Sequence, residues 1–551
     1  MVRLWKRIRW RQVAIILTSF LVLVSIWYIT ALPATEVRAD YGGTFIEGVA
    51  GAPRAINPLL SQLNDADRDL VALVFSGLTR LDERGAIIPD LAESWETSSD
   101  GLSYTFRLRP GVVWHDGVPF TAADVVLTIE TIRNPEFPGV PELSSLWSSV
   151  SVVKVDDLTV KFSLRNLYAP FLSHTTLGIV PSHILSKTPI KGLKESTFNI
   201  SPVGTGPFKF KEATAGRVTL DGNPSYYLGR PYLSTIEVKF YPDYPSALSG
   251  IERGEIHGLL SRQWLSPEDI KRISEDEKLV RYLSIRPSYS IVFLNLRFPL
   301  FKEKVVRQAL LYGLDRETMV TDLLAGQGMV AQSPIVPGTW AYDGENTKRY
   351  EYDPEKAVAL LESAGWLLNQ DGVREKAGVQ FRFHLLSNDD KSRIAVGEEM
   401  VRQWRRLGIR AELSSSGPTR LLRDFLIPRR YEAALYGLDV GYDPDPYPAW
   451  HSSQISENGF NFASFSNEKA DQILEKARQS TSRIERAKLY GEFQAIFTEE
   501  VPSLLLYYPA YTYIADEWVK GINCGVLFER SSRFNNVKDW YMRTKEVEVG
   551  R

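Results

Sequence analysis

The most densely specified stretch of the chain is residues 88–124, where an alternating segment, two turns and a helix start follow one another. Tyr104, Phe106 and Leu108 alternate with polar residues, which is the period of a strand with one buried face. The Pro-Gly and His-Asp-Gly sequences that follow favour two chain reversals. Thr121 then precedes Asp124 at the spacing of a capping box. The stretch therefore predicts a compact β unit that leads into a helix, and it contains no catalytic pattern.

The rest of the chain predicts an α/β protein of several domains. Its 551 residues exceed the ~250–300 at which one hydrophobic core stops growing, so two or three domains are expected. A strand at 381–386, a helix at 394–407 and a strand at 409–413 continue an alternating pattern that predicts a parallel or mixed sheet. Two further strands, at 503–508 and 511–514, are expected to close the chain.

The amino terminus differs from the rest. Five basic residues precede residues 13–32, a run of 20 residues without a charged side chain, which is about the length of a spanning helix. This order places the remaining chain outside the cytoplasm. A cleaved signal peptide is the competing interpretation, because Val37 and Ala39 could occupy a processing site. Since that site lies well beyond the apolar run, we expect residues 1–39 to contain an uncleaved anchor that contacts the membrane through its helix.

Charge and cysteine content exclude several classes of protein. Cys524 is the single cysteine, so neither an intramolecular disulfide nor lipid attachment at an N-terminal cysteine is possible. Without residues 1–38, which hold six basic residues and one acid, the formal charge is −7. This acidic balance argues against nucleic acid as a partner.

The sequence shows no pattern for metal or covalent chemistry. None of the six histidines has a second histidine at metal-ligand spacing, and no Gly-x-Ser-x-Gly, His-Glu-x-x-His or Walker lysine motif occurs. We therefore expect no metal, no cofactor and no catalytic residue. Asp439, Asp443 and Asp445 could form an acid and base pair for glycoside chemistry, but Asp-Pro repeats are ordinary loop sequence. A glycan or peptide hydrolase remains the less favoured alternative.

Aromatic residues in loops rich in glycine and proline are candidates for lining a cleft, where a flat ring contacts a ligand at low entropic cost. The chain has 63 aromatic residues, and most of them are expected in the core. The candidates for the cleft are Trp114, Trp340, Tyr436, Tyr442, Tyr447 and Trp450.

Five segments, in this order along the chain, resemble the family 5 solute-binding proteins of ABC transporters, the oligopeptide, dipeptide and nickel group. They are IPDLAESWETSSDGLSYTFRLRPGVVWHDGVPFTAADV, SPVGTGPFKF, NPSYYLGRPYLSTIEVKFYPD, VVRQALLYGLDRETMV and YDPEKAVALLESAGW. The resemblance implies a two-lobed periplasmic-binding-protein-like α/β fold of the cluster C type, with an additional small α+β domain and a hinge. On this layout domain I combines 40–80, 200–290 and 500–551, domain II is 81–199 and domain III is 291–499.

The resemblance also implies a function. The chain would be a monomeric extracytoplasmic protein that closes around a peptide or similar polar solute and delivers it to an ABC permease driven by ATPase subunits. A surface receptor of the same fold that senses a solute without transport is the alternative.

In peptide binders of this family, an acid just before the Asp-Pro loop of domain III pairs with the ligand's α-amine. Aligning Asp443 and Pro444 with that loop puts Val440 at the acid's position, with Asp439 one residue earlier. Either Asp439 takes the role after a local shift, or the ligand is not a free-amine peptide. The predicted ligand-binding residues are Tyr436, Asp439, Gly441, Tyr442, Asp443, Trp450 and Trp340.

Overall fold

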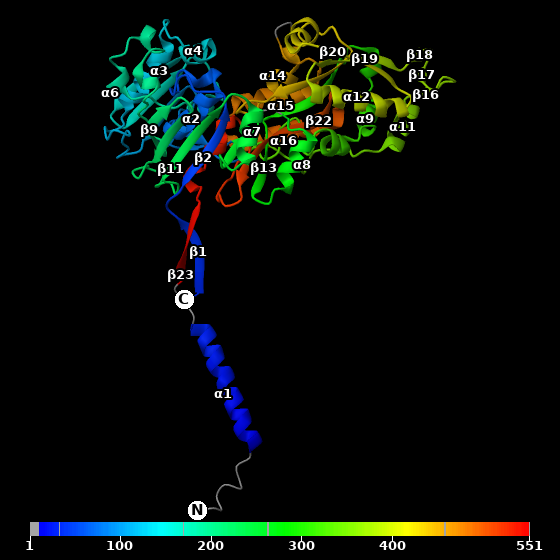
Figure 1. Cartoon of the computed structure of the whole chain (residues 1–551). Helices are drawn as coiled ribbons and strands as arrows, with labels where there is room; N and C mark the ends of the chain where they lie inside the picture. Colours follow the sequence, from blue (N-terminus) through cyan, green and yellow to red (C-terminus); the bar gives the residue numbers. More distant parts are fainter. Residues whose placement is uncertain (1–9, 32–33, 169, 262–263, 457–458, 550–551) are drawn as a thin grey trace, which may run out of the picture.

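The computed structural model describes residues 10–31, 34–168, 170–261, 264–456 and 459–549. Figure 1 shows two lobes side by side, and a helix that projects away from them at the end of a narrow ribbon. The expected two-lobed α/β fold is confirmed.

The first lobe combines segments from both ends of the body of the chain. Its strands and helices are β2 (Thr44–Ala50), α2 (Asp65–Val74), β9 (Phe208–Thr214), β10 (Arg217–Gly222), β11 (Thr235–Tyr241), α7 (Tyr244–Glu252), β12 (Gly258–Leu260), α8 (Pro267–Glu275) and β13 (Leu279–Ile285). Near the carboxyl terminus, the short helices η9 (Arg530–Phe534) and η10 (Val537–Asp539) pack in the same lobe, with η9 in contact with α2.

A smaller unit is attached to the first lobe. It contains β3 (Thr79–Leu81), β4 (Ile87–Pro89), β5 (Ala92–Thr97), β6 (Ser103–Leu108), α3 (Ala122–Arg133), α4 (Pro141–Ser148), β7 (Val150–Asp156), β8 (Thr159–Leu164), α5 (Phe171–His174) and α6 (Ser182–Leu185). Four of its strands form a separate antiparallel sheet in the order β5-β6-β8-β7.

The second lobe alternates strands and helices. Its elements are β14 (Ser288–Leu294), α9 (Lys304–Tyr312), α10 (Arg316–Thr318), β15 (Gly328–Val330), α11 (Pro354–Ser363), β16 (Leu367–Leu368), β17 (Arg374–Lys376), β18 (Val379–Gln380), β19 (Arg382–Asn388), α12 (Lys391–Arg406), β20 (Arg410–Ser416), α13 (Pro418–Arg420), β21 (Ala433–Asp439), α14 (Tyr447–Trp450), α15 (Glu468–Gln479) and α16 (Arg483–Glu500). Because β19 is parallel to both β20 and β21 while β14 is antiparallel to β21, the predicted mixed sheet is confirmed.

One long strand, β22 (Ser503–Asp516), joins the lobes through a twelve-stranded sheet in the order β20-β19-β21-β14-β22-β12-β2-β11-β10-β9, with β13 and β15 also paired to β22. The prediction of two separate strands here was wrong. Pro509 lacks an amide hydrogen, but its carbonyl accepts a hydrogen bond from the amide of Arg286 at 2.9 Å, so the strand continues through it. Arg286 also lies in the short connection from β13 to β14, the other crossing between the lobes.

The core follows this division. One cluster of buried side chains extends through the first lobe and the small unit, and a smaller one lies under α7 and α8 in the first lobe. Two others cover the opposite faces of the second-lobe sheet: Val292 of β14 belongs to one, and its neighbour Ile291 belongs to the other. This alternation is the period-2 pattern of a strand buried on both faces.

The stretch at 88–124 forms the predicted strand β6 and helix α3, and the capping box of Thr121 and Asp124 is present. Trp114 is fully buried, so its prediction as a cleft residue was wrong. The neighbouring His115 bonds both sides of the glycine-rich segment: its Nδ1 accepts from the amide of Gly204 at 3.2 Å, and its Nε2 lies 3.0 Å from the carbonyl oxygen of Gly206. Burial lowers the pKa of His115 to about 4, so it packs as a neutral ring.

The amino-terminal part stands apart from the lobes. Helix α1 (Trp10–Ala31) leads into β1 (Ala34–Asp40), which pairs antiparallel with the carboxyl-terminal strand β23 (Arg543–Val549) over seven residues to form the ribbon (Figure 1). Among the residues that the structure describes, no helix is both long enough and apolar enough to cross a membrane.

Candidate functional site

The loop at residues 440–446 leaves the second-lobe sheet at the carboxyl end of β21. Parallel neighbours β19 and β21 end at the same edge, where ligands of open α/β sheets bind. Gly441 adopts a φ of 64°, which is a backbone conformation that favours glycine. This turn lets the chain pass from the sheet towards the first lobe.

Tyr442 of this loop contacts the first lobe. Its ring stacks on Phe528, with centroids 5.7 Å apart and an interplanar angle of 17°. Its hydroxyl donates a hydrogen bond to the carboxylate of Glu529, the residue immediately before η9. Burial raises the pKa of Tyr442 well above its ordinary value, so the phenol stays protonated and remains a donor. The side chain is therefore a direct bridge between the lobes.

The two acids after Tyr442 hold the loop in place. Asp443 accepts two hydrogen bonds from the guanidinium of Arg486 in α16, at 2.8 and 2.5 Å. Asp445 accepts one from Arg478 in α15 at 2.7 Å. Bidentate pairing of this kind fixes geometry as well as charge. Because both carboxylates are committed to arginines, they position the loop and are not arranged as an acid and base pair.

Asp439, the last residue of β21 directly before this loop, is an acid that faces open space. Its side chain is 83% exposed, and the nearest cation in the described chain is Arg286, with 3.9 Å between Nη2 and Oδ1. An exposed contact of that length contributes little and leaves the carboxylate accessible. The guanidinium of Arg286 also lies 5.0 Å from the ring centre of Tyr511 in β22. Asp439 thus lies where the two lobes meet.

The remaining predicted residues differ in position. Tyr436 is half-buried and packs against the core of the second lobe. Trp340 is half-buried beneath Arg486, whose guanidinium lies 5.2 Å from its ring centre. Trp450 is 1% exposed, and its Nε1 donates to the Tyr289 hydroxyl at 3.2 Å. Trp450 is therefore mainly a core residue that reaches the wall of a cavity.

Three cavities surround the loop. One of ≈ 370 Å³ and one of ≈ 340 Å³ both have Tyr442 and Thr176 in their walls, and their other lining residues come from the first lobe and the small unit. A third, of ≈ 310 Å³, lies within the second lobe and is lined by Asp439 and Trp450. The predicted residues Tyr442, Asp439 and Trp450 therefore reach cavities, and Tyr442 lines both of the first two.

Sequence reasoning missed the first-lobe side of this cleft. The cavity of ≈ 340 Å³ is lined by Ser61, Gln62, Arg68, Trp147, His174, Glu529 and Ser531, among others. These residues come from segments far apart in the chain, and none lies in a motif. Only the folding of α2, α5 and η9 around the same space brings them together.

A polar cluster on the second-lobe sheet was missed as well. Ser290 and Ser387 are buried, and the hydroxyl of Ser387 has no hydrogen-bond partner in the described chain. Ser290 lies directly opposite Gly437, and Ser387 lies opposite Leu435, two residues earlier on β21. A Cβ at Gly437 would lie 2.7 Å from Nη2 of Arg393, so the glycine makes room for that guanidinium.

Within the residues that the structure describes, no group of three or more histidine, cysteine or acidic side chains is arranged to hold a metal ion.

Comparison with known proteins gives consistent matches. Residues 86–461 match the model for bacterial extracellular solute-binding proteins, family 5, middle region. The oligopeptide-binding protein AppA of Bacillus subtilis is 32% identical, with 92% of each chain covered. A structure of AppA from Bacillus subtilis in complex with a nonapeptide superposes with a TM-score of 0.61 and 31% identity, covering 92% of this chain and 100% of that one. A structure of NikZ from Campylobacter jejuni in complex with Ni(L-His) gives 0.63 and 31%, covering 90% and 99%.

Proposed function

This chain belongs to family 5 of the bacterial extracellular solute-binding proteins, and from that membership we propose that it is the capture component of an ABC importer. It binds a peptide or similar polar solute outside the cytoplasm, in the cleft between its lobes. Closure about the β13–β14 and β22 crossings traps the solute, which is then delivered to a membrane permease driven by ATPase subunits.

The observation that carries this proposal is the contact of Tyr442 with Phe528 and Glu529. This contact joins the second-lobe loop to the first lobe, and Tyr442 lines two cavities there. Closure of lobes around a ligand is a known way to enclose a small molecule. The aromatic and polar walls of these cavities suit a ligand with both apolar side chains and backbone amides.

The family is one of binding proteins and not of enzymes. We extend this to the chain itself and expect no hydrolysis of a bound peptide or glycan. Asp443 and Asp445, which could have served as an acid and base, are each paired with an arginine. A paired carboxylate of this kind does not move protons to a substrate without losing its partner.

Asp439 is proposed to bind the ligand's α-amine. Replacing Asp439 by alanine should weaken binding of a peptide with a free amino terminus by about tenfold or more, because an ammonium would lose its charged acceptor. N-acetylated forms of the same peptide should bind the variant and the wild type alike. Isothermal calorimetry with both peptide forms measures the difference. Equal affinities of variant and wild type for the free-amine peptide would show that Asp439 does not bind the α-amine.

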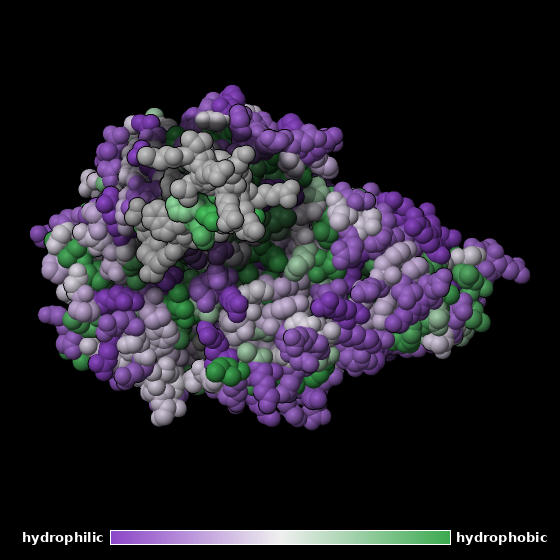
Figure 2. All heavy atoms as spheres, turned by 90° about the horizontal axis from the view of Figure 1, so that it is seen from below, coloured by the Kyte–Doolittle hydropathy of each residue, from purple (hydrophilic) through white to green (hydrophobic). Residues whose placement is uncertain are grey.

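The amino-terminal helix is proposed to hold the protein at the membrane. The large apolar side chains of residues 15–24 are exposed, and the body on the side from which α1 projects is mostly hydrophilic (Figure 2). Within the ribbon, Val37 pairs with Glu546 and Ala39 with Thr544. Cleavage after Ala39 would remove nearly all of β1 and leave β23 without its partner.

We therefore expect the native protein to keep its amino-terminal segment. Mass spectrometry of protein isolated from its own membrane fraction should find the intact chain, released by detergent and not by salt. A mature chain that begins near Asp40 would contradict the anchor and support a cleaved signal peptide.

A further inference from the structure

The ribbon of β1 and β23 occupies most of the connection between helix α1 and the lobes (Figure 1). Helix α1 ends at Ala31, β1 runs from Ala34 to Asp40, and β2 of the central sheet begins at Thr44. The two strands of the ribbon pair with each other and with no other strand of the described chain. Because an isolated two-stranded ribbon is only marginally stable in water, its order depends on what fixes it at its base.

The base of the ribbon is fixed to the first lobe on the β1 side. The ring of Tyr41 stacks on Tyr232, with centroids 5.0 Å apart, and the guanidinium of Arg230 lies 4.6 Å from the centre of the Tyr41 ring. The amide of Gly42 donates to the carbonyl of Tyr232 at 2.8 Å. Gly42 has a φ of 131°, and a Cβ there would lie 2.9 Å from Cδ of Arg543. The glycine therefore lets the two strands leave the lobe close together.

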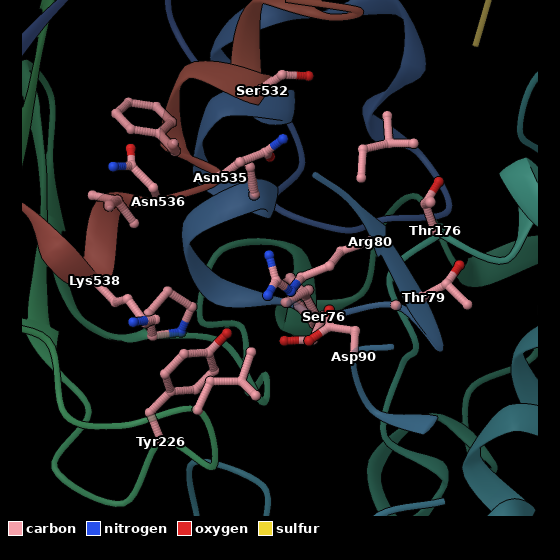
Figure 3. A pocket seen from close by; sticks show the side chains of 18 of the residues that line it. Ser76, Thr79, Arg80, Asp90, Thr176, Tyr226, Ser532, Asn535, Asn536 and Lys538 are labelled. Carbon is pink, nitrogen blue, oxygen red and sulfur yellow. The ribbon is translucent and has the colours of Figure 1, made fainter. Parts of the chain in front are cut away.

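The β23 side of the ribbon is rooted in the core. Trp540, three residues before β23, is fully buried, and its ring meets Phe45 of β2 edge-on with centroids 5.4 Å apart. Tyr541 exchanges two backbone hydrogen bonds with Lys520, at 2.9 and 3.0 Å. Figure 3 shows Lys538, from the preceding helix η10, at the wall of the cavity of ≈ 370 Å³. The direction in which the ribbon leaves the body is therefore fixed relative to the lobes and their cavities.

Pairing along the ribbon sets its length. Seven residues of β1 face seven residues of β23, from Ala34 opposite Val549 to Asp40 opposite Arg543. A diagonal ion pair joins the strands, with 3.1 Å between Nζ of Lys545 and Oδ1 of Asp40. At ~3.3 Å per residue the paired strands span about 23 Å. The same seven residues as a flexible linker would have a root-mean-square length of only about 15 Å and could fold back on themselves.

One alternative is that β23 lies on β1 without consequence. Two features favour a mechanical role instead. The pairing extends along the whole of β1, and each strand is held at the lobe by contacts of its own, through Tyr41 and Trp540. A single strand would attach the body to α1 equally well. The second strand therefore adds stiffness and not attachment.

We propose that the ribbon is a stiff stalk that holds the lobes about 23 Å above the lipid surface, with the face in Figure 2 towards the membrane. This inference rests on the proposed anchoring by α1, and it makes β23, which is far from α1 in the sequence, a part of the anchor. The body then presents one face to the bilayer and to a permease embedded in it, and it does not lie down on the lipid.

The test is fluorescence energy transfer with the full chain in lipid nanodiscs. A donor is attached through Leu367→Cys in β16, at the end of the second lobe far from the ribbon (Figure 1), and acceptors are placed on the lipid headgroups. Leu367 is 60% exposed, whereas Cys524 is buried and burial raises the pKa of its thiol to about 11, so the label enters at position 367. We expect one narrow distribution of donor lifetimes, with no fraction at lipid contact.

Prolines at two adjacent positions of β23 test the pairing. Successive amides of a strand point to opposite sides, so Lys545→Pro together with Glu546→Pro must remove a hydrogen-bond donor that faces β1. We expect this variant to stay in the membrane and to bind peptide like the wild type, but to show a broad lifetime distribution with a shortened component. Trypsin cleavage after Arg38, which gives a product that begins at Ala39, should become about tenfold faster.

The matched control is Lys545→Thr together with Glu546→Thr, which keeps residues that favour a strand and should resemble the wild type in both measurements. The outcomes separate the stalk from the anchor. If the intact chain does not enter the membrane, the proposed anchoring fails. If it enters the membrane but the wild type shows a broad distribution that includes lipid contact, or the proline and threonine variants behave alike, the stalk is wrong. The wild-type distribution decides the question even if the proline variant does not fold.

Discussion

Replacement of Arg533 by methionine is expected to lower the free energy of unfolding of the first lobe by about 3–5 kcal/mol. Arg533 is 1% exposed, and its guanidinium binds Glu47 of β2 at 2.9 Å and Asp69 of α2 at 2.7 Å. Glu47 is fully buried and also accepts from the hydroxyl of Tyr513 at 2.8 Å. Methionine removes the positive charge that both carboxylates share and leaves them in a medium of low dielectric constant.

The loss of stability in the Arg533→Met variant should depend on pH. Burial raises the pKa of Glu47, although Arg533 and Tyr513 act in the opposite direction. A group whose pKa is raised by folding contributes stability at low pH and loses that contribution as the pH rises through its folded value. Without Arg533 the pKa of Glu47 rises further. We therefore expect the deficit of the variant to be largest at neutral and alkaline pH and to shrink on acidification.

Denaturant unfolding followed by circular dichroism measures this difference. The control is Arg107→Met on β6, whose contact with Glu96 is 3.5 Å long with side chains 64% and 75% exposed. Exposed pairs contribute about 0–1 kcal/mol, so this variant should unfold like the wild type. If the two variants lost the same stability, the buried cluster would not have the structural role assigned to it.

Replacement of Tyr442 by alanine is expected to weaken peptide binding by about 10- to 100-fold. The variant loses a stacked aromatic pair, worth about 0.5–1.5 kcal/mol, and a hydrogen bond to a charged acceptor, worth about 1.5–3 kcal/mol. Both contacts exist when the lobes are together, so their loss shifts the population towards open forms. Water can form part of the lost hydrogen bonding, so we expect a loss of binding free energy smaller than the sum of these two contributions.

Calorimetry with one peptide compares Tyr442→Ala with Tyr442→Phe, which keeps the ring and loses the hydroxyl. We expect the phenylalanine variant to be intermediate. Tyr352→Ala, at a tyrosine that is 43% exposed on the second lobe, should bind like the wild type. Unchanged affinity in Tyr442→Ala would show that Tyr442 does not help to close the cleft.

Much of the fold could be predicted from local patterns. The alternation at Tyr104, Phe106 and Leu108 and the spacing of Thr121 and Asp124 correspond to β6 and a capped α3. These are effects of near neighbours in the chain, which a sequence displays directly. The continuity of β22 through Pro509 could not be seen this way, because it depends on a hydrogen bond from Arg286, more than 200 residues away.

For the candidate site, the sequence pointed to residues of one wall only. Composition pointed to the loop with Asp439 and Tyr442, because aromatic, acidic and proline residues are concentrated there. The opposite wall, with Arg80, His174 and Glu529, is built from single residues of separate elements. Each is unremarkable in its own segment. Trp114 failed as a cleft residue for a related reason: a loop rich in glycine can still fold its tryptophan into the core.

The most direct measurement of the central claim is native mass spectrometry of the wild-type protein, purified without refolding and then incubated with a mixed peptide library. We predict a one-to-one adduct with the mass of a peptide, which is released on denaturation and strongly reduced in Tyr442→Ala. A protein that carries no adduct before or after incubation with excess peptide would contradict peptide capture between the lobes.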